Sequence, residues 1–366
     1  MKYISVITLH NVRNYGSALQ TLATQEVFER LGCKVDFINF VRDEQLSYKK
    51  RIKKWCKNYS LLKKLIYGPL LIPSFIKQDK VFKSFLKRRI HLQDKQYTTP
   101  EDFKTFPITA DIYCTGSDQT WNSGWNEGII GALFLDFVPD NVKKIAYAAS
   151  FGKQKLNEDE KDETRRLLKR YDAISVRESN GVDICEDLGI YGVVNVLDPT
   201  LQLNRDFWLG IAGERKIKEP YILVYQLKAT SEFDRFAKEY AKRKKMRLVR
   251  FCYRYFQMTR PGKSLMFPAI EDFASAIYYA DTVITDSFHA TAFSINMNTD
   301  FISIYPQEYS SRIDSILKLT HLENRHLQSF DDFSLADSPH IDFTETNRIL
   351  EQEREKGWKF LRNAIK

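Results

Sequence analysis

Apolar and polar residues follow one another along the chain in blocks that predict short strands and amphipathic helices in turn. The first block, Tyr3–Leu9, is an apolar run typical of a buried strand. A polar turn follows, and apolar residues then recur at helical spacing from Ala18 to Leu31. Gly32 stands where a helix ends in the left-handed conformation, and Cys33–Phe40 predicts a second strand. Strand, helix and strand in this order form a βαβ unit, so we expect parallel strands.

The same alternation continues through both halves of the chain. In the first half, the pattern predicts strands at Ile112–Thr115, Phe134–Phe137, Lys144–Ala149, Ala173–Val176 and Val193–Val196, with helices at about Asp159–Tyr171 and Val182–Leu188. In the second half, it predicts strands at Tyr221–Leu227, Met246–Arg250, Thr282–Thr285 and Phe301–Ile304, with helices at Ser231–Lys244, Ile270–Tyr279, Phe288–Ile295 and Ile313–Leu319. Such alternation predicts an α/β fold of two Rossmann-like domains with largely parallel sheets.

The length of 366 residues also favours two domains over one core. We expect an N-terminal domain over residues 1–204, with a helical insert at about 45–92, and a C-terminal domain over 205–340. Residues 341–366 contain the helical segment Phe343–Lys366, which is expected to pack back on the N-terminal domain. Ligands of such folds bind at the carboxyl ends of the strands, so polar residues after strands are the first site candidates.

The net charge of +9 comes from the insert. Lys49–Arg89 holds fourteen Lys or Arg residues and one acid, Asp79, which leaves a net charge of −4 for the remainder. Apolar residues recur there at intervals of three and four, which predicts a basic amphipathic helix over Tyr48–Ile66. The apolar residues of this helix are Ile52, Trp55, Tyr59, Leu62 and Ile66.

This basic insert has two interpretations. One is a set of helices that cover the first domain and turn their lysines to water. The other is docking on an anionic membrane, to which each basic residue contributes about 1 kcal/mol. No recognition motif accompanies the charge, so nucleic acid is not an expected partner. Anion binding in the cleft is expected to come from individual groups such as Arg177 and not from the insert.

The cysteines indicate a reducing compartment. Their number is odd, they are widely spaced and they form no C-x-x-C motif, which argues against a disulfide framework or a zinc site. The five cysteines are Cys33, Cys56, Cys114, Cys185 and Cys252. The histidines show no metal-ligand spacing either. The start of the chain lacks a signal peptide, and no apolar run reaches the about 20 residues that span a bilayer. We expect a cytoplasmic protein with no metal and no cofactor, attached at most to the inner face of the membrane.

Two polar segments after strands are candidates in the first half. The turn Asn14-Tyr15-Gly16-Ser17 could hold an anion or sugar on backbone N–H groups, or could be a plain turn with Ser17 as N-cap. In Gly116–Asn122, Asp118 and Gln119 suit hydroxyls and Trp121 offers a flat face to a sugar ring, unless that tryptophan is a core residue. The acceptor-binding candidates are therefore Asn14, Tyr15, Gly16, Ser117, Asp118, Gln119 and Trp121.

Two charged segments also follow strands. Arg177 in Ser175-Val176-Arg177-Glu178 can grip a carboxylate or phosphate with two parallel hydrogen bonds, or can form a surface pair with Glu178. His289 lies beside Asp286 in the first turn of a predicted helix, where a positive imidazolium is disfavoured. Its pKa should therefore be lowered, which would poise the ring for acid–base chemistry at neutral pH. The alternative is a buried structural histidine.

Together these segments resemble the polysaccharide pyruvyl transferase family. The resemblance rests on segments that occur in family order, namely Asn14–Gln20, Gly116–Asn122, Tyr147–Gly152, Ser175–Glu178, Leu197-Asp198-Pro199-Thr200 and Thr285–His289. It implies two Rossmann-like halves that face a central cleft, as in glycosyltransferases of the B type (GT-B). It also implies transfer of the enolpyruvyl carbons of phosphoenolpyruvate to two hydroxyls of a sugar. The products would be a cyclic ketal on a precursor of a bacterial capsule or exopolysaccharide, and phosphate.

The resemblance also implies roles for individual residues. His289 matches the family histidine and is the candidate general acid, with Asp286 as its catalytic neighbour. Arg177 matches a family arginine proposed to hold the donor. Members commonly have Arg-Leu-His where this chain has Ser287-Phe288-His289. The donor-binding candidates are therefore Arg177, Ser287, Arg312 and Arg325. Arg312 or Arg325 would supply the positive charge of the family arginine that Ser287 replaces.

This departure keeps two other functions open. One is a glycosyltransferase-like enzyme that uses a nucleotide-sugar donor. The other is a peripheral membrane scaffold that rests on Lys49–Arg89 and catalyses nothing. Within the leading hypothesis, contact of this insert with an anionic membrane would suit a lipid-linked acceptor sugar.

Overall fold

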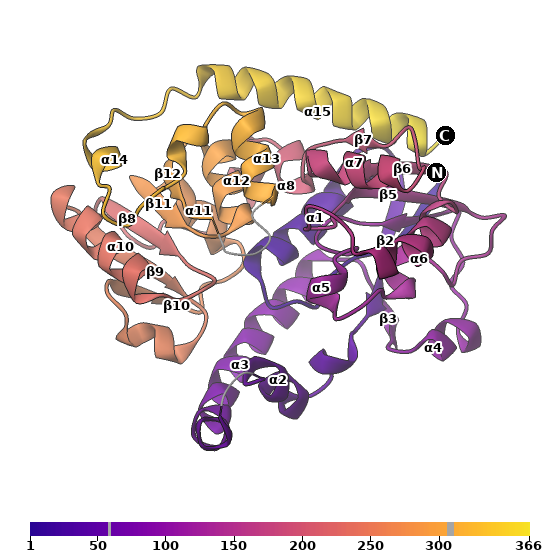
Figure 1. Ribbon diagram of the computed structural model, residues 1–366, viewed down its shortest axis with the longest axis horizontal. Coiled ribbons are helices and arrows are strands. Elements are labelled where there is room, and N and C mark those ends of the chain that lie inside the picture. The colour runs from indigo at the N-terminus through magenta and orange to yellow at the C-terminus, as the bar shows by residue number, and fades with distance from the viewer. Residues whose placement is uncertain (58–59, 306–310) are drawn as a thin grey trace.

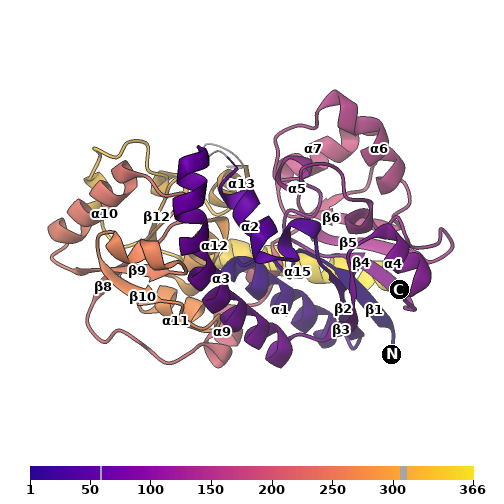
Figure 2. The same cartoon turned by 90° about the horizontal axis from the view of Figure 1, so that it is seen from below.

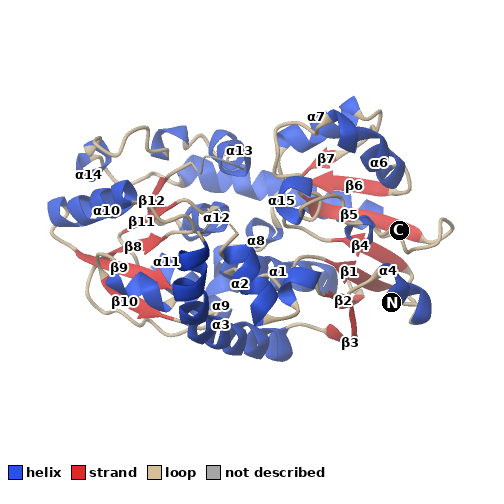
Figure 3. Cartoon of the chain, turned by 60° about the horizontal axis from the view of Figure 1, so that its bottom comes forward, coloured by secondary structure: helices blue, strands red, loops and turns tan. Residues whose placement is uncertain are grey.

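The computed structural model describes residues 1–57, 60–305 and 311–366, and within them the strands form two parallel sheets (Figures 1 and 3). The first sheet has the order β3-β2-β1-β4-β5-β6-β7, with β1 Tyr3–Ile7, β2 Lys34–Phe40, β3 Leu92–Tyr97, β4 Ile112–Thr115, β5 Lys143–Ala149, β6 Ala173–Val176 and β7 Val194–Asn195. The second has the order β10-β9-β8-β11-β12, with β8 Tyr221–Tyr225, β9 Arg247–Cys252, β10 Lys263–Met266, β11 Thr282–Thr285 and β12 Asp300–Ser303. The expected α/β class with parallel sheets is confirmed.

Helices connect the strands and cover the sheets. Those of the first half are α1 Tyr15–Arg30, α2 Tyr48–Trp55, α3 Leu61–Arg89, α4 Pro100–Thr105, α5 Ser123–Asn126, α6 Glu158–Leu168, α7 Ser179–Asp187 and α8 Pro199–Gln202. Those of the second half are α9 Arg205–Ile211, α10 Ser231–Arg243, α11 Asp272–Tyr278, α12 Phe288–Met297, α13 Ser311–Leu319, α14 Ser334–Asp337 and α15 Thr344–Ala364. Short 3₁₀ turns lie at Asp43–Gln45, Gly131–Phe134, Tyr255–Thr259 and Glu323–Arg325.

The start of α1 differs from the prediction in its capping residue. Asn14, and not Ser17, is the N-cap, because its Oδ1 accepts hydrogen bonds from the backbone N–H groups of Gly16 at 2.8 Å and Ser17 at 3.3 Å. The helix therefore begins at Tyr15 and brings Ser17 inside its first turn. At the other end, Gly32 has φ +73°, which confirms the predicted left-handed residue after the helix.

The predicted strand Phe134–Phe137 is wrong. A 3₁₀ turn ends at Phe134, and Leu135 follows with φ 57° in the left-handed region. The N–H groups of Leu135 and Val138 donate to carbonyls three residues earlier, so the segment closes on itself and does not pair with a strand. The side chains of Phe134 and Leu135 are nevertheless buried. The prediction failed because a short apolar run does not distinguish a buried turn from a buried strand.

The basic insert forms α2 and α3, and the helix predicted over Tyr48–Ile66 is divided because α2 ends at Trp55. Tyr59 lies outside the described residues. Helix α3 reaches the second domain, where Gln78 Nε2 donates to the carbonyl of Tyr253 at 2.6 Å. In Figure 2 the two helices lie across the boundary between the domains. No helix among the described residues is long and apolar enough to cross a membrane.

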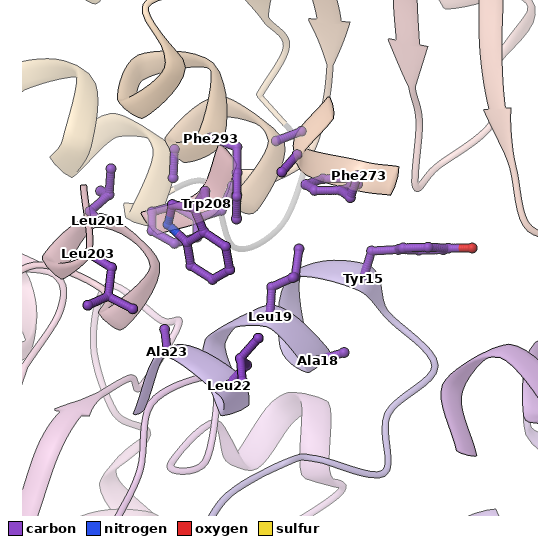
Figure 4. Close-up of a cluster of buried hydrophobic side chains, with 14 of the residues drawn as sticks. Tyr15, Ala18, Leu19, Leu22, Ala23, Leu201, Leu203, Trp208, Phe273 and Phe293 are labelled. Carbon is purple, nitrogen blue, oxygen red and sulfur yellow. The ribbon is translucent and has the colours of Figure 1, made fainter. Parts of the chain in front are cut away.

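The two domains share one continuous core at helix α1. Leu19 and Leu22 on α1 face Trp208 of α9 and Phe293 of α12, as Figure 4 shows. Helix α15 runs along both domains in Figure 1, and its Arg354 donates to the carbonyl of Leu201 at 2.9 Å and to Asn296 Oδ1 at 3.0 Å. The N-termini of α1 and α12 are thereby held next to each other.

Candidate active site

A cavity of about 260 Å³ lies where the carboxyl ends of the two sheets face each other. We call it the donor cavity, after the expectation from the sequence that Ser287 and Arg312 bind a donor. The first domain contributes the turn before α1 and the loop after β4, and the second contributes the loop after β8 and the start of α12 and of α13. Its polar or charged lining residues are Asn14, Ser17, Asp118, Gln119, Lys228, Asp286, Ser287, His289 and Arg312. Many of the residues expected from the sequence therefore meet at one place.

His289 lies at the contact between the two helix N-termini. Ser287 caps α12, because its Oγ accepts from the N–H of Ala290 at 3.4 Å, and this sets His289 in the first turn. The imidazole rests against Gly16 of α1 so closely that a Cβ on Gly16 would stand 2.1 Å from His289 Cγ. Only a residue without a side chain fits there, which explains the glycine in the Asn14–Ser17 turn.

The pKa of His289 is lowered to about 4, chiefly by burial, although the carboxylates of Asp198 and Asp118 oppose the shift. The downward direction agrees with the prediction, but the main cause is burial and not the helix dipole. The expected poise near neutral pH is wrong, because a ring with this pKa is neutral at pH 7. Its Nε2 lies 3.9 Å from Asp198 Oδ2 and has no hydrogen-bond partner among the described residues.

Arg177 does not line the donor cavity. Its side chain has no exposed area, and its guanidinium pairs with Asp198 at 2.7 Å and with Asp118 at 3.2 Å. Glu178 lies 3.8 Å from the same group. The role of direct donor ligand is therefore corrected: Arg177 is paired with buried carboxylates and holds Asp118 and Asp198 beneath His289, although its Nε has no hydrogen-bond partner among the described residues. The sequence did not show this because Asp118 and Asp198 are distant along the chain.

Asp118 stands between this buried network and the cavity. Its carboxylate accepts hydrogen bonds from Ser17 Oγ and from the backbone N–H of Gln119, in addition to the Arg177 pair. Burial alone would raise the pKa of Asp118, but Arg177, His289 and Ser17 outweigh it and hold the pKa well below its usual range. The residue has φ 76°, which is sparsely populated for a side chain other than glycine. Such a strained backbone after a strand is typical of functional sites.

Arg312 on α13 is the cation best placed to meet an anionic donor. Burial and the like charge of Arg177 lower its pKa to about 10, so it remains charged at neutral pH. Its Nε has no hydrogen-bond partner within the described part of the chain. Its guanidinium carbon lies 5.6 Å from the ring centre of Phe288, and this contact orients the guanidinium beside the N-terminus of α12. Among the described lining residues, Lys228 is the other permanent cation.

Asp286 also lines the cavity, but its contacts are structural. Its two oxygens accept hydrogen bonds from the backbone N–H groups of Leu227 at 2.7 Å and Lys228 at 2.8 Å. These bonds tie the loop after β8 to the start of α12. Burial raises the pKa of Asp286 to about 6 despite the two backbone donors. A direct catalytic role of Asp286 stays a prediction, whereas a positioning role follows from its contacts.

Besides Arg177 and Gly16, four expected site residues do not line the donor cavity. Trp121 is a core residue between Phe134 and Phe151, with ring centres 5.4 and 5.2 Å away, so no sugar can stack on it. Tyr15 is buried between the domains and donates to the carbonyl of Pro268 at 2.8 Å. Ser117 has no exposed area and donates to Asp198 at 3.2 Å, and Arg325 donates to the carbonyl of Pro339 at 3.3 Å. The sequence suggested each of the four by its residue type or by its place after a strand. Packing against segments that are distant in the sequence buries all four.

The residue that sequence reasoning left without a role is Asp198. It accepts hydrogen bonds from Thr200 N at 2.9 Å and Thr200 Oγ1 at 2.7 Å, and so caps α8 beneath His289. Burial would raise the pKa of Asp198, but Arg177 and His289 lower it below its usual range. The available signal was the Asp-Pro-Thr sequence, in which an aspartate precedes a proline that suits the first helical position. Ser17 and Lys228 were likewise not assigned to the site.

The two parallel sheets and the cavity between their carboxyl ends define a GT-B-like protein, and solved structures share this architecture. UDP-N-acetylglucosamine 2-epimerase from Rickettsia bellii gives a TM-score of 0.53 at 7% identity, over 99% of this chain and 96% of that chain. The S. aureus MnaA–UDP co-structure gives a TM-score of 0.51 at 10% identity, over 97% of each chain. At these identities the likeness shows the fold, and it confirms the predicted architecture.

The family is shown by a second comparison. The family model for polysaccharide pyruvyl transferase matches residues 14–308, so the chain belongs to this family. Membership assigns it to the pyruvyl transferases of polysaccharide biosynthesis, whose acceptor is a sugar. No curated protein matches the sequence. Among the described residues, no group of three or more His, Cys, Asp or Glu side chains could hold a metal ion.

Proposed function

We propose that the protein transfers the pyruvyl group of phosphoenolpyruvate to two hydroxyls of one sugar in a surface polysaccharide precursor, forming a cyclic ketal. The observation that carries this proposal is the convergence of Arg312 and His289 on one enclosed cavity in a member of the pyruvyl transferase family. Phosphoenolpyruvate bears a phosphate and a carboxylate on three carbons. Arg312, Lys228 and the positive end of α12 supply charge for these anions.

His289 is the proposed general acid. The ring is neutral at pH 7 because burial lowers its pKa to about 4. A donor with several negative charges raises that pKa when it binds, because an opposite charge favours the protonated imidazole. Binding of the donor therefore favours uptake of a proton by His289 from solvent. Arg177 holds the carboxylates of Asp118 and Asp198 beneath the ring, so the imidazolium has a compensating charge.

The proposed reaction then proceeds in four steps. His289 gives its proton to the methylene carbon of phosphoenolpyruvate, and the neighbouring carbon becomes cationic. One acceptor hydroxyl adds to that carbon and gives its proton back to His289. The bond between that carbon and the phosphate oxygen breaks, and phosphate leaves with the bonding electrons. The second hydroxyl adds to the renewed cation and its proton passes to the departing phosphate, which closes the ketal. Asn14, Asp118 and Gln119 on the first-domain wall are proposed to bind the acceptor hydroxyls.

The test is product formation with a defined acceptor. The protein is incubated with phosphoenolpyruvate and either a nitrophenyl hexoside or a lipid-linked glycan. We expect phosphate release that depends on the acceptor, together with an acceptor whose mass has increased by one pyruvyl ketal. Phosphate release that is independent of every acceptor, with no such product, would refute the proposal.

A nucleotide-sugar donor remains the second candidate. It is favoured by Ser287 at the place of the family arginine and by the pairing of Arg177 with buried carboxylates, which together leave fewer cations for phosphoenolpyruvate. A thermal-shift screen separates the two donors. Stabilisation by phosphoenolpyruvate and not by nucleoside diphosphates supports the first proposal, and the reverse result supports this one.

We also propose that the insert touches an anionic membrane. Leu65, Leu70 and Ile76 on α3 are 68%, 65% and 51% exposed, and the exposed Lys77 and Lys80 lie near them along the helix. Apolar side chains beside lysines suit an interface of lipid tails and anionic headgroups. In a flotation assay the protein should follow vesicles that contain phosphatidylglycerol, and salt should release it. Flotation that is indifferent to salt and to anionic lipid would contradict this contact.

A further inference from the structure

A second cavity opens beside the donor cavity and has a different character. Its volume is about 480 Å³, and it shares the lining residues Val12, Asn14, Trp125 and Leu227 with the donor cavity. We call it the basic cavity. Its cations come from both domains and from the insert, and they are Arg13, Arg42, Arg51, Lys54 and Arg254. Because the two cavities share four lining residues, they adjoin each other.

The basic cavity has more cations than carboxylates. Glu44 is the acid among its described lining residues, and it pairs with Arg42 at 3.2 Å and with Lys54 at 3.1 Å. Asp79 behind the wall pairs with both Arg13 and Arg51 at 2.8 Å. Four of the cations, Arg13, Arg42, Arg51 and Lys54, share these two carboxylates, so these six groups carry a net charge of +2. Such an excess in a cleft attracts a ligand with about two negative charges.

Aromatic rings hold these guanidinium groups in place. Arg42 lies over the ring of Trp125 at 4.1 Å, Arg51 over Phe75 at 4.2 Å, and Arg254 over Trp55 at 3.8 Å. Stacking fixes the plane of each guanidinium before a ligand arrives, so less side-chain entropy is lost on binding. Planar, fixed guanidinium groups suit phosphate oxygens, which they bind with two parallel hydrogen bonds.

The insert builds one wall of this cavity. On α2, Arg51 and Lys54 line the cavity, whereas Lys50 and Lys53 are exposed, as is Lys57 after the end of the helix. The expectation from the sequence is anion binding in the cleft by individual groups such as Arg177 and not by the insert, and the sequence does not show that these two basic side chains line the cleft.

We propose that the basic cavity binds the diphosphate of a glycosyl diphosphate acceptor and directs its sugar past Asn14 and Trp125 into the donor cavity. This inference rests on the proposed function, because it assigns the acceptor of the same reaction. A glycosyl diphosphate can be attached to a prenyl chain or to a nucleoside. The cations and stacked rings recognise the diphosphate common to both.

The test is equilibrium binding by titration calorimetry with three probes, namely geranyl-diphosphoglucose, UDP-glucose and methyl glucoside. We expect at least one diphosphate probe to bind and methyl glucoside to bind far more weakly. Lys54→Gln should weaken the diphosphate probe about tenfold, because one phosphate contact is lost. Lys53→Gln is the matched control, with the same change on the neighbouring exposed residue, and should leave binding unchanged. Trp55→Leu is a second variant and should also weaken binding, because it removes the ring beneath Arg254.

The outcomes separate this inference from the proposed function. Binding of the geranyl probe alone assigns a lipid-linked acceptor, and binding of UDP-glucose alone assigns a nucleotide-linked ligand. Specific binding without any use of phosphoenolpyruvate would remove the proposed function and keep the site. Absence of binding by both diphosphate probes, or equal weakening by Lys54→Gln and Lys53→Gln, would overturn the site. Ketal formation on a neutral hexoside would in that case keep the proposed function.

Discussion

At the scale of single residues, the site is a neutral histidine held over an arginine that is paired with buried carboxylates. His289, Arg177, Asp118 and Asp198 are all buried, and the cation and carboxylates compensate one another. Removing one partner of such a buried pair leaves an uncompensated charge and is strongly destabilising. The chemistry therefore depends on a network that no single sequence segment contains.

The first prediction concerns the pH dependence of stability. The pKa of His289 in the folded protein is about 4, below the ordinary 6.5, so the unfolded chain binds a proton first as pH falls. The stability that comes from the neutral ring is complete above pH 6.5 and is lost as pH falls toward 4. Between pH 7 and pH 5, His289→Asn should lose about 2 kcal/mol less free energy of unfolding than the wild type.

Urea unfolding of the two proteins at both pH values measures this difference. Comparison with the variant is needed because His10 is also buried with its pKa lowered to about 4, and Asp286 shifts in the opposite direction. Equal losses in wild type and variant would show that the His289 ring titrates normally in the fold.

The second prediction concerns Gly16. Gly16→Ala places a methyl group 2.1 Å from His289 Cγ, so the imidazole must move. Since a displacement of about 1 Å can lower a rate about a hundredfold, we expect kcat to fall by about that factor. Gly210→Ala, at a helical glycine with no atom within 4 Å of the new Cβ, is the matched control. Full activity of Gly16→Ala would contradict the close packing of α1 on α12.

The sequence predicted only part of this site. His289, Asp118, Asn14 and Gln119 were found because they follow strands, and parallel strands bring their carboxyl ends together. The roles of Arg177 and Trp121 were wrong because burial by distant segments decides whether a side chain reaches a cavity. Charge and residue type alone do not show which partners already occupy a guanidinium.

At the scale of elements, helix N-termini and their caps set the geometry of the site. Asn14, Asp198 and Ser287 cap α1, α8 and α12, and these helices contact one another beneath the donor cavity. Most strands were predictable from apolar runs, because both faces of a parallel sheet are buried. The edge strands β3 and β10 were missed, because each is only partly buried and carries no long apolar run.

The third prediction tests the contact between α1 and its neighbours. Trp208 is fully buried against Phe293, and its Nε1 donates to the carbonyl of Thr200 at 2.9 Å. Trp208→Ala should lower the free energy of unfolding by about 3–5 kcal/mol, because it leaves a cavity at the domain junction. Tyr191→Ala, at a residue 79% exposed, should change it by less than about 0.5 kcal/mol. Denaturant unfolding measures both, and equal effects would contradict the shared core.

At the scale of the whole molecule, two domains and an insert line two adjoining cavities. Helix α15 spans both domains, and α3 contacts the second domain from the first. The basic residues of the insert therefore fall into two groups, with several lysines exposed to solvent and Arg51 and Lys54 facing the cleft. The sequence located this charge but could not say which residues turn inward, because that depends on how the domains meet.

The central claim is that the donor cavity binds phosphoenolpyruvate through Arg312, and calorimetric titration of the donor tests it most directly. Wild type and Lys318→Gln, an exposed change on the same helix, should bind phosphoenolpyruvate equally. Arg312→Gln should bind about thirtyfold more weakly, because a charged hydrogen-bond partner contributes about 2 kcal/mol. Failure of the wild type to bind phosphoenolpyruvate, or unchanged binding by Arg312→Gln, would contradict the account.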